Sequence, residues 1–296
     1  MKKWITAIGL SLVLLTGCAS SDGKKINSSE NNNQEIDSTE DHRIIAGTVV
    51  VATILDKLNL DAVAVPETIK QLPSRFDGLP NIGNAMSPDP ETIKMLNPTE
   101  FITVSTLESD LKEPFGKYKI PAAYLDLTSI EGMLAEINTL GERYNRTKEA
   151  DALVAELNAE IESVQKVAKQ NEKPRVLILL GVPGSYIVAT EHSYAGDLVR
   201  IAGGENVIEG QDAEYLPSNS EYLYNSNPDI ILRLAHGMPD EVVEMFDEEF
   251  VTNDVWKHFN AVKNDRVFDL EEELFGTTAA LNVSEALKVL QEIFYN

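Results

Sequence analysis

Residues 147–170 carry one long helical pattern that divides the sequence into two halves. The apolar side chains of this segment recur mainly at spacings of three and four residues: Ala150, Leu153, Val154, Leu157, Ile161, Val164 and Ala168. Thr147 is placed to cap the start of the helix, and Pro174 stops it. At about 1.5 Å per residue the helix extends about 36 Å, enough to run along two neighbouring lobes. The chain is therefore constrained to fold around a long central helix.

Each half alternates apolar, strand-like runs with helical patterns, as α/β units do. In the first half we expect strands at 43–46, 61–66, 101–105 and 122–125, with helices after Gly47-Thr48 and from Ile130. In the second half we expect strands at 175–180, 230–234 and 267–270, a helix at 197–202 and a closing helix at 284–295. The predicted fold class is α/β with two lobes, 42–128 and 172–296, joined by connecting helices at 129–171. The length of 296 residues agrees with about two folding units.

A short repeat supports two related lobes. Glu91 is followed six residues later by Asn-Pro at 97–98 and then by a predicted strand, and Glu221 stands at the same offset from Asn-Pro at 227–228. A carboxylate at the start of a helix suits the helix dipole. A matched pair, one on each lobe, could equally dock onto arginines of a partner. The residues alone leave both interpretations open.

The amino terminus has the features of an export signal. Two lysines precede an apolar run at 4–15, which is too short for a bilayer span of about 20 residues. The Leu-Thr-Gly-Cys sequence ending at Cys18 resembles the bacterial lipobox, whose cysteine receives diacylglycerol and becomes the first residue after cleavage. We therefore expect a signal peptide at 1–17, a lipid on Cys18 and a flexible polar tether at 18–41, which anchors the protein at the extracellular face of the membrane. An ordinary signal peptide with an incidental cysteine is the alternative.

Charge and cysteine content exclude several classes of function. Lys plus Arg number 25 against 48 Asp plus Glu, and a net charge of -23 repels the phosphate backbone, so nucleic-acid binding is disfavoured. Cys18 is the single cysteine, which removes disulfide frameworks, cysteine zinc sites and iron–sulfur clusters. The histidines lack His-x-x-x-His spacing, and no Gly-x-Ser-x-Gly sequence is present, so we expect no enzyme. A secreted enzyme is the rival from another class.

Two side chains are candidate metal ligands. Met86 lies in a predicted loop at 83–89, and His236 follows the carboxyl end of the predicted strand at 230–234. Ligands of open α/β sheets gather at this end of the strands. Each residue alone also fits a packing methionine or an ordinary loop histidine. Together, one thioether and one imidazole from opposite lobes match the axial pair of a six-coordinate haem iron.

Several longer segments resemble a known family: 83–88, 176–186, 197–208, 227–239 and 256–264. They are similar to the haem-receptor lipoproteins of the iron-regulated surface determinant systems of Gram-positive bacteria, and the likeness covers essentially the whole chain. The run Arg-Leu-Ala-His-Gly-Met-Pro at 233–239 is its most specific part, although Ala235 stands where the family is expected to have proline.

The resemblance implies a helical-backbone substrate-binding protein of the iron-compound class, with two α/β lobes and little hinge motion. Such a protein receives haem from cell-wall carrier proteins and delivers it to an ABC permease, without a catalytic step. The family's axial ligands fall on Met86 and His236, and its permease-docking glutamates on Glu91 and Glu221. The expected ligand is non-covalent haem b, and the expected state is a monomer.

The ligand's two propionates need hydrogen-bond donors. The helix that follows Gly47 could supply backbone N–H groups at its amino terminus, at Thr48, Val49 and Val50. The same scaffold could instead hold a ferric siderophore or cobalamin, which would favour several Arg, Tyr or Trp side chains in the cleft. The Met86 and His236 pair favours haem.

Overall fold

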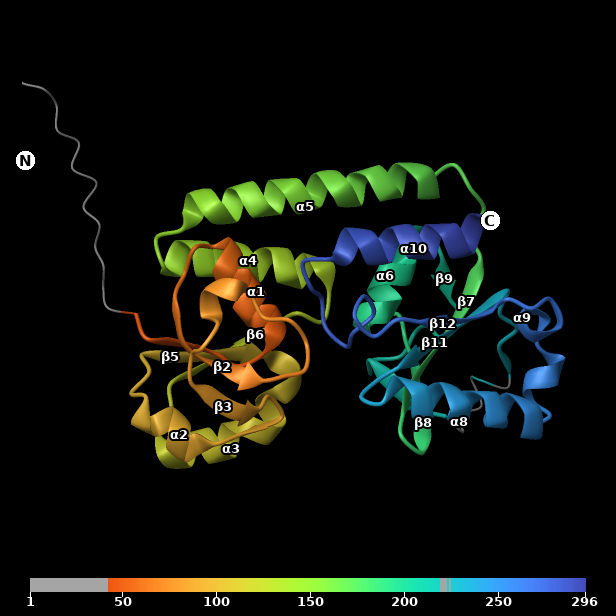
Figure 1. Cartoon of the computed structure of the whole chain (residues 1–296). Coiled ribbons are helices and arrows are strands. Elements are labelled where there is room, and N and C mark those ends of the chain that lie inside the picture. The colour runs from red at the N-terminus through yellow and green to blue at the C-terminus, as the bar shows by residue number, and fades with distance from the viewer. Residues whose placement is uncertain (1–41, 219–222, 224) are drawn as a thin grey trace, which may run out of the picture. The chain divides into compact units, whose positions relative to one another are not determined.

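The computed structural model describes residues 42–218, 223 and 225–296, and these form two sheets flanked by helices (Figure 1). Cys18, the signal peptide, the tether and Glu221 lie outside the described residues. Along the part of the chain that is described, no helix combines the length and the apolar character that crossing a membrane requires. The expected α/β class with two lobes is confirmed.

The sheet of the first lobe has the strand order β4-β3-β2-β1-β5-β6. Its strands are β1 (Ile44–Ala46), β2 (Ala62–Glu67), β3 (Asn81–Asn84), β4 (Ser87–Pro88), β5 (Glu100–Val104) and β6 (Ala122–Leu125). Its helices are α1 (Val49–Lys57), α2 (Pro90–Met95) and α3 (Glu108–Tyr118). All neighbouring strands are parallel except β3 and β4. The central strands are short apolar runs, because helices cover both faces of a parallel sheet and bury the side chains on each face.

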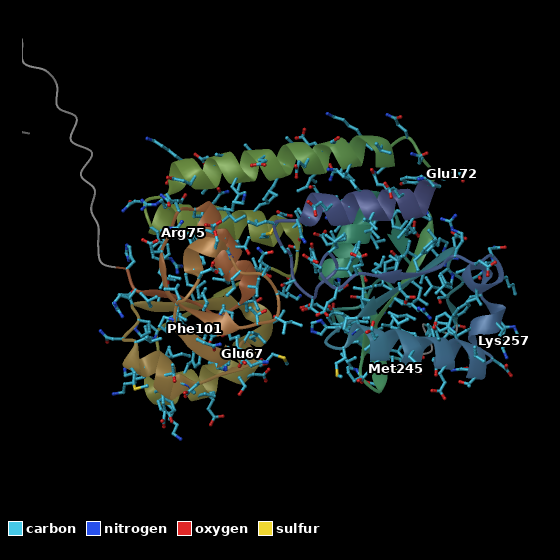
Figure 2. The ribbon with its side chains drawn as sticks, in the orientation of Figure 1. Glu67, Arg75, Phe101, Glu172, Met245 and Lys257 are labelled. Atoms are coloured by element: carbon cyan, nitrogen blue, oxygen red, sulfur yellow. The ribbon has the colours of Figure 1, made fainter. Side chains whose placement is uncertain are left out.

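The sheet of the second lobe has the order β10-β8-β7-β11-β12, with β9 beside β7. Its strands are β7 (Arg175–Val182), β8 (Ser185–Ala189), β9 (Glu205–Asn206), β10 (Tyr215–Pro217), β11 (Ile230–Ala235) and β12 (Val267–Leu270). Its helices are α6 (Tyr194–Ala202), α8 (Pro239–Thr252), α9 (Asn260–Lys263) and α10 (Val283–Tyr295). β7, β11 and β12 are parallel, so the carboxyl ends of these strands lie at one edge of the sheet. In Figure 2, Phe101 marks the first lobe and Met245 of α8 the second.

Helix α5 (Thr147–Ala168) connects the lobes, with α4 (Ile130–Arg143) packed beneath one end and α10 beneath the other (Figure 1). Its buried face includes Leu153, Leu157 and Ile161, as the spacing predicts. The prediction that Thr147 caps this helix is wrong. The N-cap is Arg146. Its carbonyl accepts the first intrahelical hydrogen bond from the Ala150 N–H at 2.9 Å, while its side chain makes no capping bond.

Buried hydrogen bonds hold the two lobes in one arrangement. The Asp197 carboxylate on α6 accepts the N–H of Ile130 at 2.8 Å and so satisfies a free donor at the start of α4. The Ala279 N–H donates to the Leu127 carbonyl at 2.7 Å. The buried apolar side chains of both lobes also form one continuous cluster through α4, α5, α6 and α10. The two lobes therefore share one continuous apolar core.

The sequence repeat has a geometric counterpart. Arg43, just before β1, donates from Nε to the Asn97 carbonyl at 3.1 Å. Arg175, the first residue of β7, donates from Nη1 to the Asn227 carbonyl, also at 3.1 Å. In each lobe the Asn-Pro step therefore joins the first strand to the parallel strand beside it. The two lobes repeat the same local construction.

Candidate functional site

A cavity of about 1070 Å³ has walls from both lobes. The first lobe contributes the start of α1 at 48–50, the segment 66–71 and the turn at 84–86. The second lobe contributes His236 and side chains between 272 and 282. Two distant parts of the sequence therefore meet at one space large enough for a sizeable organic ligand.

Met86 lies in a loop as predicted, but this loop is the two-residue turn of a hairpin, because β3 and β4 occupy the rest of 83–88. Asn84 and Ser87 pair across this turn, and the Asn84 Oδ1 atom accepts the Met86 N–H at 2.8 Å. Met86 is 64% exposed although its side chain is large and apolar. The hairpin thus presents a thioether in the cavity wall without burying it in the core.

His236 follows β11 directly, and both its backbone and its side chain have partners. Its N–H donates to the Gly181 carbonyl of β7 at 2.9 Å. Its Nδ1 atom lies 3.1 Å from Oε1 of Glu272. A carboxylate accepts hydrogen bonds, so this contact suits a proton on Nδ1, which would leave the Nε2 lone pair of a neutral imidazole free. This is the form of histidine that binds a metal.

Lys70 adds a cation from the opposite lobe. Its Nζ atom lies 3.8 Å from Oε1 of Glu272, the oxygen that also faces His236. Both Lys70 and Glu272 line the cavity. Sequence analysis missed both residues, since neither belongs to a motif and their proximity depends on how the lobes pack.

The start of α1 presents backbone donors to the cavity. Thr48 is the N-cap, and its Oγ1 accepts the Val51 N–H at 3.4 Å. The N–H groups of Val49 and Val50 have no acceptor within the helix, because the first turn lacks a preceding one. Gly47 lets the chain pass close to the Phe101 ring just before the helix. A Cβ at this position would lie 2.6 Å from the ring, so only glycine fits the turn. The predicted residues Thr48, Val49 and Val50 all line the cavity.

Glu91 lies elsewhere, in the first turn of α2 and outside the cavity wall. The Asp89 carboxylate caps this helix by accepting the Glu91 N–H at 2.9 Å, and hydrogen bonding from Thr92 lowers the pKa of Asp89. The Tyr118 hydroxyl donates to Glu91 at 3.3 Å, and the Glu91 charge raises the pKa of Tyr118. Glu91 is thus an oriented, exposed carboxylate on the surface of the first lobe.

The cavity can therefore offer one sulfur and one nitrogen ligand from opposite lobes. Among the described residues, no three His, Cys, Asp or Glu side chains gather in a way that could hold a metal ion. A metal bound here would have to bring its remaining ligands with it. Thioether and imidazole are suited to iron that already sits in a macrocycle.

The family model for periplasmic binding proteins matches residues 44–274. The chain belongs to this family. It is 45% identical over 294 residues, 99% of this chain and 97% of the relative, to the high-affinity heme uptake system protein IsdE of Staphylococcus aureus strain Newman.

Solved structures of this family are also similar. The crystal structure of S. aureus IsdE complexed with heme superposes with a TM-score of 0.83 at 46% identity, covering 86% of this chain and 99% of that one. An ABC transporter substrate-binding protein of Listeria monocytogenes EGD-e gives a TM-score of 0.82 at 53% identity, covering 86% and 98% of the two chains. The periplasmic binding protein fold is thus shared with both.

Proposed function

We propose that this protein is a membrane-anchored haem-binding lipoprotein that captures haem and delivers it to an ABC permease, with Met86 and His236 as the axial ligands. The observation that carries the proposal is the presence of both side chains, one from each lobe, in the wall of a single cavity. His/Met is an established axial pair of haem iron. The 45% identity to a heme uptake protein supports the same ligand.

The cavity fits haem b held without covalent bonds. Its volume of about 1070 Å³ lies at the upper end of small-molecule sites. Val49, Val50, Val104, Leu274 and Leu281 give it apolar wall area, and the Nδ1–H tautomer of His236 leaves Nε2 free for iron. The single cysteine, Cys18, precludes the paired thioether links of covalently attached haem.

A ferric siderophore or cobalamin is the second candidate ligand, and the lining disfavours it. The described residues of the cavity wall include Lys70 as the one lysine or arginine and contain no Tyr or Trp. Several such side chains would be expected around a polar iron chelate. A carrier is also favoured over an enzyme, because the matching family is one of binding proteins and the curated relative is a heme uptake protein.

The propionates of haem are proposed to accept hydrogen bonds at the start of α1. Val49 is the first helical residue, where proline is well tolerated, so Val49→Pro removes one N–H with little cost to the helix. Titration of the wild-type protein with haemin should show saturable binding of one haem per chain and a low-spin Soret spectrum. Val49→Pro and haemin dimethyl ester should each bind about 10-fold more weakly, because each loses charge-assisted hydrogen bonds.

The two changes provide each other's control. Once the propionates are esterified, Val49→Pro should have little further effect. Absence of saturable binding in the wild type would refute the function, whereas equal affinity of wild type and Val49→Pro for haemin would refute only the propionate site.

The partner surface is proposed to include Glu91 and Glu221, one on each lobe, which would bind arginines of the permease. The lipid on Cys18 would keep the protein at the extracellular face of the membrane, within reach of cell-wall haem carriers. Cells with Glu91→Ala and Glu221→Ala together should take up haem iron about 10-fold more slowly. Haemin affinity of the purified variant should stay unchanged, and Glu113→Ala on the exposed side of α3 is the matched control. Normal uptake by the double variant would refute the docking role.

A further inference from the structure

The pairing of β11 with β12 sets His236 opposite Glu272. Arg233 lies in register with Asp269 and Leu234 with Leu270. His236 and Glu272 each come two residues after the last paired positions, Leu234 and Leu270, so the same count along the two parallel chains places them side by side just beyond the paired strands. The contact of 3.1 Å between Nδ1 and Oε1 thus joins two residues that the strand pairing brings close together.

Glu272 is held in place by its surroundings, so its contact with His236 has a fixed geometry. Its side chain is 18% exposed, whereas the His236 side chain is 40% exposed. The carboxylate is thus withdrawn into the wall while the imidazole reaches the cavity. Lys70 supplies the counter-charge from the first lobe, at 3.8 Å from the same oxygen. Lys70, Glu272 and His236 thus form one chain of close contacts across the two lobes, with the carboxylate between the ammonium group and the imidazole.

We infer that Glu272 is a positioning residue for the metal ligand His236: it holds the proton on Nδ1, directs Nε2 into the cavity and increases the basicity of the imidazole. Lys70 places a cation beside the carboxylate and helps to hold it in position. The inference rests on the proposed function, since it assigns Nε2 to haem iron. Outer-shell carboxylates of this kind fix the tautomer and ring orientation of metal-binding histidines.

The neighbouring Glu273 provides a matched control. It lines the same cavity one residue away and has the same charge, but its side chain contacts neither His236 nor Lys70 as an ion pair among the described residues. An effect due only to negative charge near the haem should therefore appear in both Glu272→Gln and Glu273→Gln. An effect due to the contact with Nδ1 should appear only at position 272.

The decisive experiment compares wild type, Glu272→Ala, Glu272→Gln and Glu273→Gln in two measurements. Nitrogen-15 NMR of the protein without haem should show the Nδ1–H tautomer of His236 in the wild type and in Glu273→Gln. Glu272→Ala should lose this preference, and Glu272→Gln should keep much of it, since the amide oxygen still accepts the proton. This measurement needs no bound haem.

The second measurement uses the haemin complexes. Glu272→Ala should bind haemin about 10- to 100-fold more weakly. The reduction potential of its bound haem should shift to more positive values, because a less basic imidazole donates less charge to ferric iron. Glu272→Gln should show the potential shift with a smaller loss of affinity, and should remain informative if Glu272→Ala does not fold.

The outcomes separate the two proposals. A His236 tautomer that is the same in wild type and in Glu272→Ala, or a potential that shifts equally in Glu273→Gln, overturns the role of Glu272. A wild-type protein that shows the Nδ1–H tautomer and its loss in Glu272→Ala, but binds no haemin, overturns the proposed function and leaves the positioning of His236 by Glu272 intact.

Discussion

Replacing His236 by alanine should abolish the low-spin spectrum of the haemin complex and weaken haemin binding by at least about 100-fold. Loss of an outer-shell partner of a metal ligand typically lowers affinity by up to about 100-fold, and loss of the ligand itself should lower it further. The imidazole is the stronger of the two proposed ligands, and its removal leaves the described part of the cavity wall without an imidazole. Soret and visible spectra during a haemin titration measure both effects.

Met86→Ala should have a smaller effect of a different kind. A thioether is the weaker ligand, so its loss should give a five-coordinate, high-spin complex with about 10-fold lower affinity. Because Met86 is 64% exposed in a hairpin turn, removal of its side chain should leave the stability of the fold unchanged. A thioether that leaves easily also suits a carrier that has to release its cargo.

Two exposed residues serve as controls for these ligand variants. Met95 is 78% exposed on α2 and lies outside the cavity wall, and the His192 side chain is 55% exposed. Met95→Ala and His192→Ala should both retain the wild-type spectrum. A low-spin spectrum that persists in both His236→Ala and Met86→Ala would contradict the ligand assignment.

Local patterns were sufficient to predict most strands and helices near the site. The strand expected at 122–125 is β6 (Ala122–Leu125), and the helix expected after Gly47-Thr48 is α1, capped by Thr48. Met86 and His236 could be proposed because each stands out from its neighbours chemically. Such features depend on residues close together in the sequence, which is why they can be predicted from it.

Contacts between distant segments could not be predicted in the same way. Nothing in the sequence gives the register of β11 against β12, so the pairing of His236 with Glu272 emerges only from the fold. The opposite charges of Arg233 and Asp269, each three residues before a site residue, are the one local hint. Helix α8 was also missed, although Pro239 at its start and the acids that follow are typical of a helix amino terminus.

Arg233 should be one of the most important residues for stability in the second lobe. Its side chain is 8% exposed and bonds Asp269 through Nε and Nη2, at 2.7 and 2.5 Å. Asp247 of α8 accepts from Nη1 at 2.9 Å, and the guanidinium lies 5.5 and 5.3 Å from the ring centres of Phe246 and Phe250. This one side chain therefore ties β11 to β12 and to α8.

Arg233→Ala should lower the free energy of unfolding by about 3 kcal/mol, measured by urea denaturation. The substitution leaves a cavity beside the two rings and removes the partner of both carboxylates. The expected loss stays below that of a fully buried ion pair, because the side chains of Asp269 and Asp247 are 40% and 66% exposed and water can solvate them. Arg233→Met should recover part of the loss, since it restores the packing without the charge.

Lys257→Ala is the control, because its ion pair with Asp254 is exposed on both sides and should change stability by less than about 0.5 kcal/mol. Equal effects of Arg233→Ala and Lys257→Ala would contradict the structural role of Arg233.

The loss of Arg233 should affect the cavity as well as the stability of the lobe. Arg233 and Asp269 fix the register that places His236 opposite Glu272, so Arg233→Ala should also weaken haemin binding even where the protein remains folded. The most specific run of the sequence thus combines a residue that sets the strand pairing with the histidine that this pairing orients.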